Sequence, residues 1–382
     1  MTTEQAPLPR PLPPEAALPM DIHDERLDTP AILVDLGAVE ANVARMAAFA
    51  QRAGLLLRPH VKTHKSLAMA RRQLAAGAAG LCVATASEAA VMAGTGVNDI
   101  VLAYPLVGRR KLERVAALIV GSVLTLVTDS SEVTEGYRGL ARQLGHVVPV
   151  LVEVDSGMNR AGADPRSVVK VASDVARGDG LKFRGILTHA GHAHDTTDPL
   201  SIERVARREA RIMGAVREEL EAAGLEVPVV SAGSTLTAPY LRASDGITEI
   251  RPGTYIYNDL RTLGCYACTH DAIAATALAT VVSLNGDRVT IDAGGKTLTP
   301  SIDAIYGLGH LRGDPDAPVA RLSEEHGVLT VDGAESRVAI GDRVQVLPVH
   351  VCAWMDLHAE VYGVRGGHIV ERISVDAMRH SL

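Results

Sequence analysis

Short apolar runs alternate along most of this chain with longer segments that carry apolar residues every three or four positions. Helical periodicity is clear over Leu36 to Ala53 and over the charged segment from Ile202 to Ala223. The apolar runs of strand length are Ala31 to Val34, Leu55 to His60, Gly80 to Ala84, Ile100 to Tyr104, Leu124 to Thr128, Val147 to Val154, Phe183 to His189 and Val229 to Ser231. Strands that alternate with helices indicate parallel β/α units with right-handed crossovers. About eight such units favour a closed, TIM-like (β/α)8 barrel in the α/β class over an open doubly wound sheet.

The pattern changes after Arg251-Pro252-Gly253. From Ala274 onward the apolar runs are short and β-branched, and Gly, Asp and Asn turns such as Asn285-Gly286-Asp287 separate them. This is typical of an antiparallel β domain. The first twenty residues carry six prolines without the basic-then-apolar order of a secretory signal. We therefore expect an extended proline-rich arm over 1–26, a barrel over 27–265 and a C-terminal β domain over 266–382.

Composition restricts the classes of partner. The net charge of −7 comes without a basic stripe, which argues against nucleic acid and against an anionic membrane surface. The longest apolar run, near Val115 to Val127, is too short to span a bilayer. Four cysteines in 382 residues do not form a disulfide framework, so we expect a reducing, cytoplasmic setting. Cys265 and Cys268 lack a second pair at zinc-site spacing, and we interpret them as coincidental.

A lysine follows the second predicted strand, in the stretch Leu57-Arg58-Pro59-His60-Val61-Lys62. Pro59 disfavours a helix here, so Lys62 is expected at the carboxyl end of a buried strand. A lysine held at such a position can be desolvated, which favours the neutral amine and makes it a nucleophile toward aldehydes. The alternative is a solvated Lys/His loop on the surface.

Two glycine-plus-hydroxyl turns also follow strands, at Gly233-Ser234-Thr235 and at Gly253-Thr254-Tyr255. Turns of this kind present backbone N–H groups that suit a phosphate, although many serve as plain helix caps. Together with a lysine at a strand end, they indicate a phosphorylated aldehyde held as a Schiff base. Pyridoxal 5'-phosphate is the obvious cofactor of this kind.

The C-terminal domain adds a candidate metal pair in Pro348-Val349-His350-Val351-Cys352. Alternate residues on an extended segment point to the same side, so His350 and Cys352 could share one ion. An imidazole with a thiolate favours a zinc-like ion, although geometry and availability could select another. The alternative is a buried cysteine beside an unrelated histidine.

Seven motifs in order carry a resemblance to a known family: Asp28-Thr29-Pro30, Arg58-Pro59-His60-Val61-Lys62, Glu153-Val154-Asp155-Ser156-Gly157 with Arg160, Ala232-Gly233-Ser234-Thr235, Arg251-Pro252-Gly253-Thr254-Tyr255, Ser323-Glu324-Glu325-His326-Gly327 and His350-Val351-Cys352. The chain resembles the alanine racemase-like, fold type III pyridoxal phosphate enzymes, in the branch of the D-threonine aldolases and eukaryotic-type D-serine dehydratases. This resemblance implies a homodimer with sites near its interface and a D-3-hydroxy-amino acid as the small-molecule substrate.

The resemblance also implies roles for individual residues. Lys62 matches the family's Schiff-base lysine, and Arg160 matches an arginine that stabilises the phenolic oxygen of the cofactor. His350 and Cys352 match a metal pair next to the cofactor, for a divalent ion such as Zn, Mn or Mg. The remaining positions expected to contact the cofactor, mainly around its phosphate, are His60, His189, Gly233, Ser234, Thr235, Gly253, Thr254 and Tyr255.

Two reactions are open. Retro-aldol cleavage would give glycine and an aldehyde, whereas β-elimination from D-serine or 3-hydroxy-D-aspartate would give a keto acid and ammonia. Cys352 matches the dehydratases, because the aldolases typically pair the metal histidine with Asp. His194 stands where the aldolases place a basic histidine and the dehydratases a Tyr, unless it is a solvated loop histidine beside Asp195. We favour the aldolase, because the base decides which bond breaks while Cys and Asp can both hold a metal.

Three other classes are less compatible with this set of residues. An amino acid racemase would need a second acid/base group on the opposite face of the cofactor ring and no metal. A non-catalytic cofactor carrier is expected to be a lone barrel without a metal-bearing β domain. A purely structural protein would not need so many polar clusters at strand ends.

Overall fold

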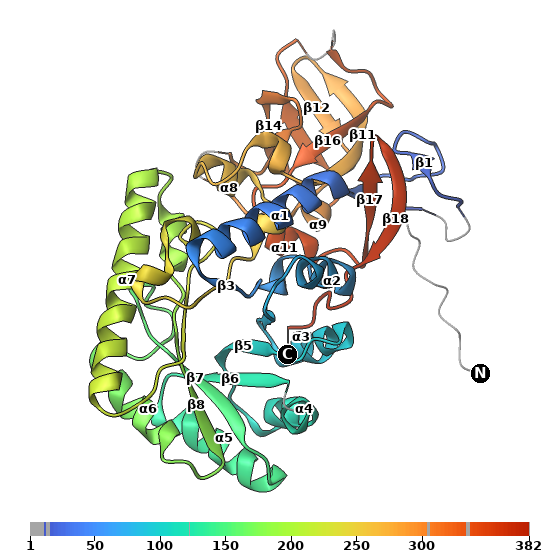
Figure 1. The fold of residues 1–382 in the computed structure, drawn as a ribbon. Coiled ribbons are helices and arrows are strands. Elements are labelled where there is room, and N and C mark those ends of the chain that lie inside the picture. The colour runs from blue at the N-terminus through green and yellow to red at the C-terminus, as the bar shows by residue number, and fades with distance from the viewer. Residues whose placement is uncertain (1–10, 13–15, 122, 304–305, 334–336, 382) are drawn as a thin grey trace, which may run out of the picture. The chain divides into compact units, whose positions relative to one another are not determined.

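The computed structural model describes residues 11–12, 16–121, 123–303, 306–333 and 337–381, and the chain divides into two compact units (Figure 1). One unit takes the described residues up to Val39, together with Tyr257–Arg261 and His270–Ser374. The other takes Glu40–Ile256, Thr262–Thr269 and the chain from Val375 onward. Both units are therefore assembled from segments that lie far apart in the sequence.

The second unit is built on an eight-stranded parallel sheet. Its strands are β3 (Leu56–Leu57), β4 (Leu81–Val83), β5 (Ile100–Pro105), β6 (Leu124–Thr128), β7 (Val148–Glu153), β8 (Leu181–Leu187), β9 (Val229–Ala232) and β10 (Glu249–Ile250). Their order is β3-β10-β9-β8-β7-β6-β5-β4, and a parallel bridge between His60 and Cys82 joins the two ends of this order. The predicted TIM-like barrel is confirmed.

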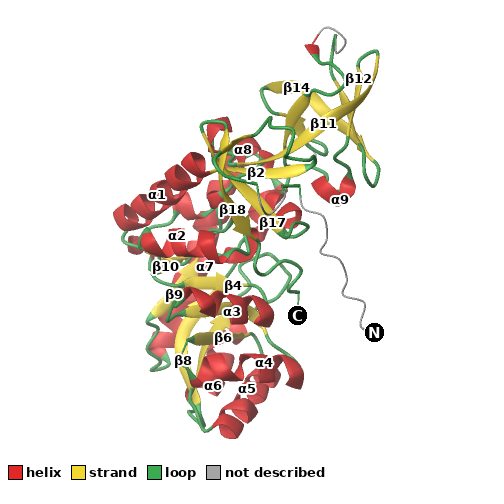
Figure 2. Cartoon of the chain, turned by 90° about the vertical axis from the view of Figure 1, so that its right-hand side faces the viewer, coloured by secondary structure: helices red, strands yellow, loops and turns green. Residues whose placement is uncertain are grey.

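Helices follow the strands of this barrel, as Figure 2 shows for α3 to α6. The helices that follow its strands are α2 (Leu67–Ala75), α3 (Ala86–Met92), α4 (Arg109–Val120), α5 (Ser131–Leu144), α6 (Val168–Ala176) and α7 (Pro199–Ala222). Local sequence fixes their starts: Asp198 accepts hydrogen bonds from the N–H groups of Leu200 and Ser201, and Pro199 occupies the first turn of α7.

Alternation along the strands separates the barrel interior from the layer beneath the helices. Val150 and Val152 belong to the large core that packs against the helices, whereas Leu151 belongs to a separate cluster with Val101, Val127 and Leu187. Because alternate residues of a strand share a face, that small cluster fills the inside of the barrel. The side chain two positions after each of its members therefore faces the carboxyl-end mouth.

The first unit contains a closed antiparallel barrel, which confirms the predicted antiparallel β domain. Its strands are β11 (Ala275–Asn285), β12 (Arg288–Ile291), β13 (His310–Leu311), β14 (Asp314–Leu322), β15 (Gly327–Thr330) and β16 (Arg343–Leu347). They pair in the order β11-β12-β15-β14-β13-β16, and β16 pairs back to β11. Beside β11 the sheet continues through β2 (Ala31–Asp35), β17 (Glu360–Arg365), β18 (His368–Ser374) and β1 (Met20–Asp21).

The structure differs from the predicted barrel strands in two places. The run from Ala31 to Val34 forms strand β2, but it pairs with β11 and β17 of the antiparallel domain rather than in the parallel barrel. The eighth barrel strand is instead β10, which was not predicted. An apolar run carries no periodicity that distinguishes the two sheets, and a strand of two residues is too short to produce a pattern. Helix α1 (Leu36–Ala53) has the predicted bounds.

Residues 1–10 and 13–15 of the predicted N-terminal arm lie outside the described residues. Leu12 is fully buried; its N–H donates to the Tyr362 hydroxyl at 3.1 Å, and its carbonyl accepts from Arg372 at 2.9 Å.

The shorter helices of the chain are α8 (Leu260–Gly264), α9 (Gly295–Leu298) and α11 (Val351–Met355). Across the described ranges, no helix is long and apolar enough to cross a membrane.

Candidate active site

Lys62 lies where the lysine motif predicts, immediately beyond a barrel strand. It occupies a single turn of 3₁₀ helix, Val61–Thr63, and its side chain is half-buried. The His60 side chain caps this turn, because its Nδ1 accepts from the backbone N–H of Lys62 at 3.5 Å. The lysine is therefore held by a short capped turn rather than by a long solvated loop.

Two histidines share the surroundings of Lys62. Burial holds the pKa of His60 well below its usual range, and the positive charges of Lys62 and Arg251 lower it further. Burial likewise depresses the pKa of His189, with added contributions from Lys62, Arg251, Arg160 and His194. Both imidazoles are accordingly neutral at neutral pH. These mutual effects show that the barrel brings together Lys62, His60, Arg160, His189 and His194, all of which were predicted site residues.

Arg251 fixes the geometry of this end of the barrel. Its guanidinium donates to Ser231 Oγ at 2.6 Å and to the backbone carbonyl of Thr188. Ser231 in turn donates to Glu249 at 2.6 Å, and Glu249 pairs with Arg58 at 2.7 Å. The chain of contacts spans strands β8, β9, β10 and the end of β3, so the cation at the mouth is locked by buried partners.

The two glycine turns also meet in space. The Tyr255 N–H donates to Thr235 Oγ1 at 3.3 Å, which joins the second turn to the first. A Cβ added at Gly253 would lie 2.9 Å from the carbonyl oxygen of His60, so this turn packs directly on the segment that carries Lys62. The Tyr255 hydroxyl accepts from Gln73 at 3.0 Å, and burial raises its pKa.

Several backbone donors of the first turn have protein partners. The N–H of Gly233 donates to the buried carboxylate of Glu209 at 3.1 Å, and the N–H of Ser234 donates to Thr237 Oγ1 at 2.8 Å. Burial raises the pKa of Glu209. Gly233 has a left-handed backbone, with φ of 81°, that favours glycine. Phosphate binding by Gly233, Ser234, Thr235, Gly253 and Thr254 stays a prediction.

This end of the barrel fits an anionic, phosphorylated aldehyde. A half-buried amine lies with two arginine charges and two neutral imidazoles, so the donor set suits phosphate and phenolate oxygens. The side chain of Glu153 offers a further buried oxygen, Oε2, that has no hydrogen-bond partner. The residues present therefore fit pyridoxal phosphate.

His194 lies in the short helical segment Gly191–Asp195, which follows β8. Its side chain is exposed, and its charge contributes to the low pKa of His189. An exposed imidazole at the mouth has the access to substrate that a general base requires.

The candidate metal pair has a different local structure from the one predicted. His350 is the extended N-cap residue of α11, and Cys352 lies inside the first turn of that helix. The extended-segment argument for a shared side was therefore wrong for Cys352. Asp259 anchors the turn by accepting from the Val351 N–H at 3.1 Å. In the described part of the chain, no group of three or more His, Cys, Asp and Glu side chains is placed to hold a metal ion.

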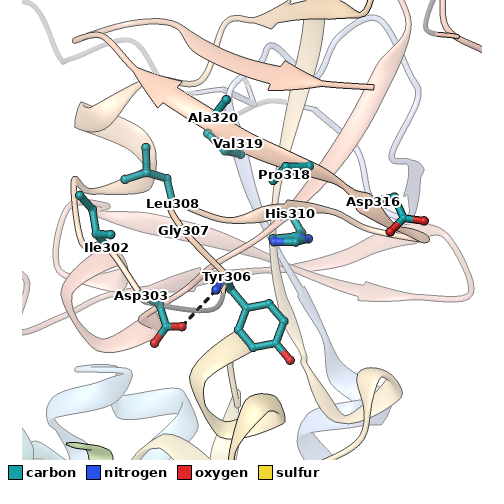
Figure 3. Close-up of a pocket in the computed structure, with 10 residues that line it drawn as sticks. All are labelled: Ile302, Asp303, Tyr306, Gly307, Leu308, His310, Asp316, Pro318, Val319 and Ala320. Carbon is teal, nitrogen blue, oxygen red and sulfur yellow. Dashed lines mark hydrogen bonds between the residues drawn. The ribbon is translucent and has the colours of Figure 1, made fainter. Parts of the chain in front are cut away.

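A separate cavity of about 640 Å³ lies in the antiparallel domain (Figure 3). Tyr306 and His310 meet edge to face there, and the Tyr306 N–H donates to Asp303 at 3.1 Å. No predicted site residue lines this cavity.

Two site residues were quoted in sequence motifs without being assigned a function. Arg251 and Glu153 are each the residue that ends or follows a barrel strand at an inward-facing position. Alternation along β7 was a signal that could have identified Glu153, since Leu151 shares its face, whereas β10 is too short to carry a pattern that identifies Arg251.

Comparison with known proteins supports a specific family. The alanine racemase N-terminal domain family matches residues 34–260, and the putative serine dehydratase domain family matches residues 274–364. The chain belongs to the fold type III, alanine racemase-like family. Within it, the two-domain combination corresponds to the branch of the D-threonine aldolases and D-serine dehydratases.

Members of this family with different names are almost equally similar to the chain. D-threo-3-hydroxyaspartate dehydratase of Delftia sp. is 33% identical over 86% of this chain and 91% of its own. D-threonine aldolase of Arthrobacter sp. is 32% identical over 91% of this chain and 92% of its own. The crystal structure of D-threonine aldolase from Filomicrobium marinum superposes with a TM-score of 0.89, at 30% identity, over 96% of this chain and 100% of that one.

Solved structures of D-threo-3-hydroxyaspartate dehydratase also include alanine variants of a histidine and of a cysteine two positions further on, the cysteine variant in a metal-free form. That metal-free structure is 30% identical, with a TM-score of 0.85, over 91% of this chain and 97% of that one.

Proposed function

We propose that this chain is a metal-assisted, pyridoxal phosphate-dependent lyase that cleaves D-3-hydroxy-α-amino acids between Cα and Cβ, as a D-threonine aldolase does. The observation that carries the choice is His194, an exposed imidazole whose charge acts on His189, which in turn lies with Lys62. The D-threonine aldolases of Arthrobacter sp. and Filomicrobium marinum support the same activity.

Each group has a proposed part in the reaction. When bound, pyridoxal phosphate withdraws electrons from a bond at the substrate's Cα, and the metal acts as a Lewis acid. The amine of Lys62 holds the cofactor, while Arg160 and Arg251 balance its negative charge. The phosphate is received by Gly233, Ser234, Thr235, Gly253 and Thr254, beside Tyr255, His60 and His189. His350 and Cys352 would hold the divalent metal (Zn, Mn or Mg).

His194 has the decisive proton transfer in this proposal. Its imidazole takes the proton of the substrate β-hydroxyl, the Cα–Cβ bond breaks, and the β-carbon leaves as an aldehyde. A proton then returns to Cα and gives glycine. His60 and His189 stay neutral, so they add no further positive charge beside Lys62.

A dehydratase acting on D-serine or 3-hydroxy-D-aspartate is the second candidate. Cys352 has the residue type of that class, and the 33% identity to the Delftia dehydratase supports it. In that reaction the α-proton leaves, the hydroxyl departs, and hydrolysis gives a keto acid and ammonia. We also propose a cytoplasmic homodimer, in keeping with four cysteines that form no disulfide and with the family resemblance.

Products from two substrates test the proposal. Purified enzyme loaded with pyridoxal phosphate and a divalent metal is incubated with D-threonine and with D-serine, and glycine, acetaldehyde, pyruvate and ammonia are measured. We expect glycine and acetaldehyde from D-threonine, and a loss of about 100-fold or more in kcat for His194→Ala, since general bases contribute 10²–10⁴-fold.

Two control variants distinguish the loss of cofactor binding from a change in which substrate bond is cleaved. Lys62→Ala should form neither product and should show no visible cofactor absorbance that borohydride can bleach. Asp195→Asn, beside the proposed base, should keep the aldolase activity. Pyruvate and ammonia from D-serine, without glycine from D-threonine, would select the dehydratase instead.

A further inference from the structure

The carboxyl group of Glu153 is held inside the barrel at its mouth. Glu153 is the last residue of β7, and only 4% of its surface is exposed. Leu151, two positions earlier, packs in the cluster that fills the barrel, whereas Val152 packs beneath the helices. Because alternate strand residues share a face, the Glu153 side chain is directed into the barrel above Leu151.

One oxygen of this carboxyl group lacks a partner. Glu153 Oε2 is inaccessible to solvent and makes no hydrogen bond. A buried oxygen in this state is less favourable than a paired one, and the penalty is larger when the group is charged. A site that is complete without a ligand would not be expected to retain such an atom at its mouth.

The charges around Glu153 come from several elements. Arg251 follows β10 and Arg160 follows β7, and both favour the carboxylate. Asp129 follows β6 and Asp155 follows β7, and both favour the protonated acid. Burial is the largest effect, and together these influences raise the pKa of Glu153 above its ordinary value.

We propose that Glu153 is a neutral carboxylic acid in the resting barrel and that its unpartnered oxygen donates a hydrogen bond to an anionic oxygen of the pyridoxal phosphate bound at the mouth. A neutral donor adds a hydrogen bond without adding a third carboxylate beside Asp129 and Asp155. This inference rests on the proposed function, because it takes pyridoxal phosphate as the ligand. It adds to that function a residue that contacts the cofactor.

The proposed hydrogen bond from Glu153 to the cofactor is tested by comparing the cofactor affinity of three proteins. The apo forms of the wild type, Glu153→Gln and Glu153→Leu are titrated with pyridoxal phosphate, and binding is followed by visible absorbance. Gln keeps a neutral donor, so its dissociation constant should stay within about threefold of the wild type at neutral pH. Leu removes the donor, and the constant should rise about 10–100-fold, as expected for a hydrogen bond to a charged group.

The pH dependence of pyridoxal phosphate affinity distinguishes a hydrogen-bond donor at Glu153 from a purely structural role of this residue. The donor is present below the raised pKa of Glu153 and is lost as pH rises through it. The affinity of the wild type relative to Glu153→Gln should therefore fall with rising pH, while other titrating groups cancel in the ratio. Glu218→Gln, on the exposed face of α7, is the matched control and should follow the wild type.

Infrared difference spectroscopy tests the protonation state without any cofactor. The resting wild type at neutral pH should show a protonated-carboxyl band that is missing in Glu153→Gln. Absence of that band, or a Gln variant that binds as weakly as Leu, would overturn the inference, as would a folded Leu variant with unchanged affinity. If the wild type itself fails to bind pyridoxal phosphate, the proposed function fails, while the infrared result still decides the protonation of Glu153.

Discussion

At the scale of single residues, a few side chains determine the charge at the barrel mouth. Arg251 is locked by Ser231 and by the carbonyl of Thr188, so its charge stays at a fixed place. Together with burial and Lys62, that charge keeps His60 and His189 neutral. Neutral imidazoles can accept or donate a hydrogen bond, which a protonated pair packed against a lysine could not do without repulsion.

Gly253 provides a test of how tightly the second turn packs against the lysine segment. A Cβ at this position would lie 2.9 Å from the carbonyl oxygen of His60 and 3.0 Å from Thr63 Oγ1. Gly253→Ala should push the turn away from Lys62 and weaken pyridoxal phosphate binding by about tenfold, equivalent to ~1.4 kcal/mol. Titration of the apo protein measures this change.

The control for that substitution is Gly136→Ala on α5, where an added Cβ meets nothing within 4 Å. It should leave cofactor affinity unchanged and stabilise the helix by about 0.5–1 kcal/mol. Equal cofactor affinity in both alanine variants would show that the turn at Gly253 does not position the lysine segment.

The residue types of the site were predictable, whereas their supporting contacts were not. Lys62, Arg160 and His189 could be placed at strand ends because parallel strands bring their carboxyl ends together. The partner of Gly233 could not, because Glu209 lies on α7, 24 residues earlier, and nothing in its helical pattern distinguishes it from a surface glutamate. The geometry of Cys352 was missed because a helix of one turn leaves no periodicity.

At the scale of elements, helix α2 depends on the far end of the chain. Its N-cap residue, Ser66, makes no capping hydrogen bond. Instead Asp376 accepts from the Leu67 N–H at 2.7 Å, and the Ala377 N–H donates to the carbonyl of Lys65 at 2.9 Å. The C-terminal residues therefore cap the helix that begins directly after the lysine turn.

Loss of this cap should lower stability and should also weaken cofactor binding at Lys62. Asp376→Ala removes an acceptor and a negative charge from the start of α2, which should cost about 1 kcal/mol of unfolding free energy. We also expect weaker pyridoxal phosphate binding, because α2 follows Lys62 by only five residues. Urea unfolding and cofactor titration measure the two effects, and Asp376→Asn, which keeps an acceptor, should recover part of both.

Ser130→Ala is the matched control, because Ser130 caps α5 through the Val133 N–H at 3.4 Å. It should lower stability by a similar amount without changing cofactor affinity. If both alanine variants weaken the cofactor equally, the effect comes from general destabilisation and the cap has no special link to Lys62.

At the scale of the whole molecule, the position of a segment in the sequence does not determine which of the two units it belongs to. The first predicted strand pairs with β11, some 240 residues later, and the last residues of the chain return to the parallel-barrel unit. Local patterns predicted both architectures, because each strand and helix carries its own periodicity. They could not assign β2 or the C-terminal tail, because long-range pairing leaves no local signal.

Removal of the metal provides the last test. Treating the holoenzyme with a chelator should abolish lyase activity while the visible absorbance of the bound cofactor persists, because Lys62 and the proposed metal ligands belong to different units.

Cys352→Ala should likewise lose metal, measured by elemental analysis. Cys352→Asp should regain an ion and shift its preference from zinc toward manganese or magnesium, since carboxylate oxygen is the harder ligand. Cys268→Ala, which removes a second half-buried cysteine that forms no disulfide, should retain the metal. Full metal content in Cys352→Ala would exclude Cys352 as a ligand and would remove the argument for the dehydratase that its residue type provides.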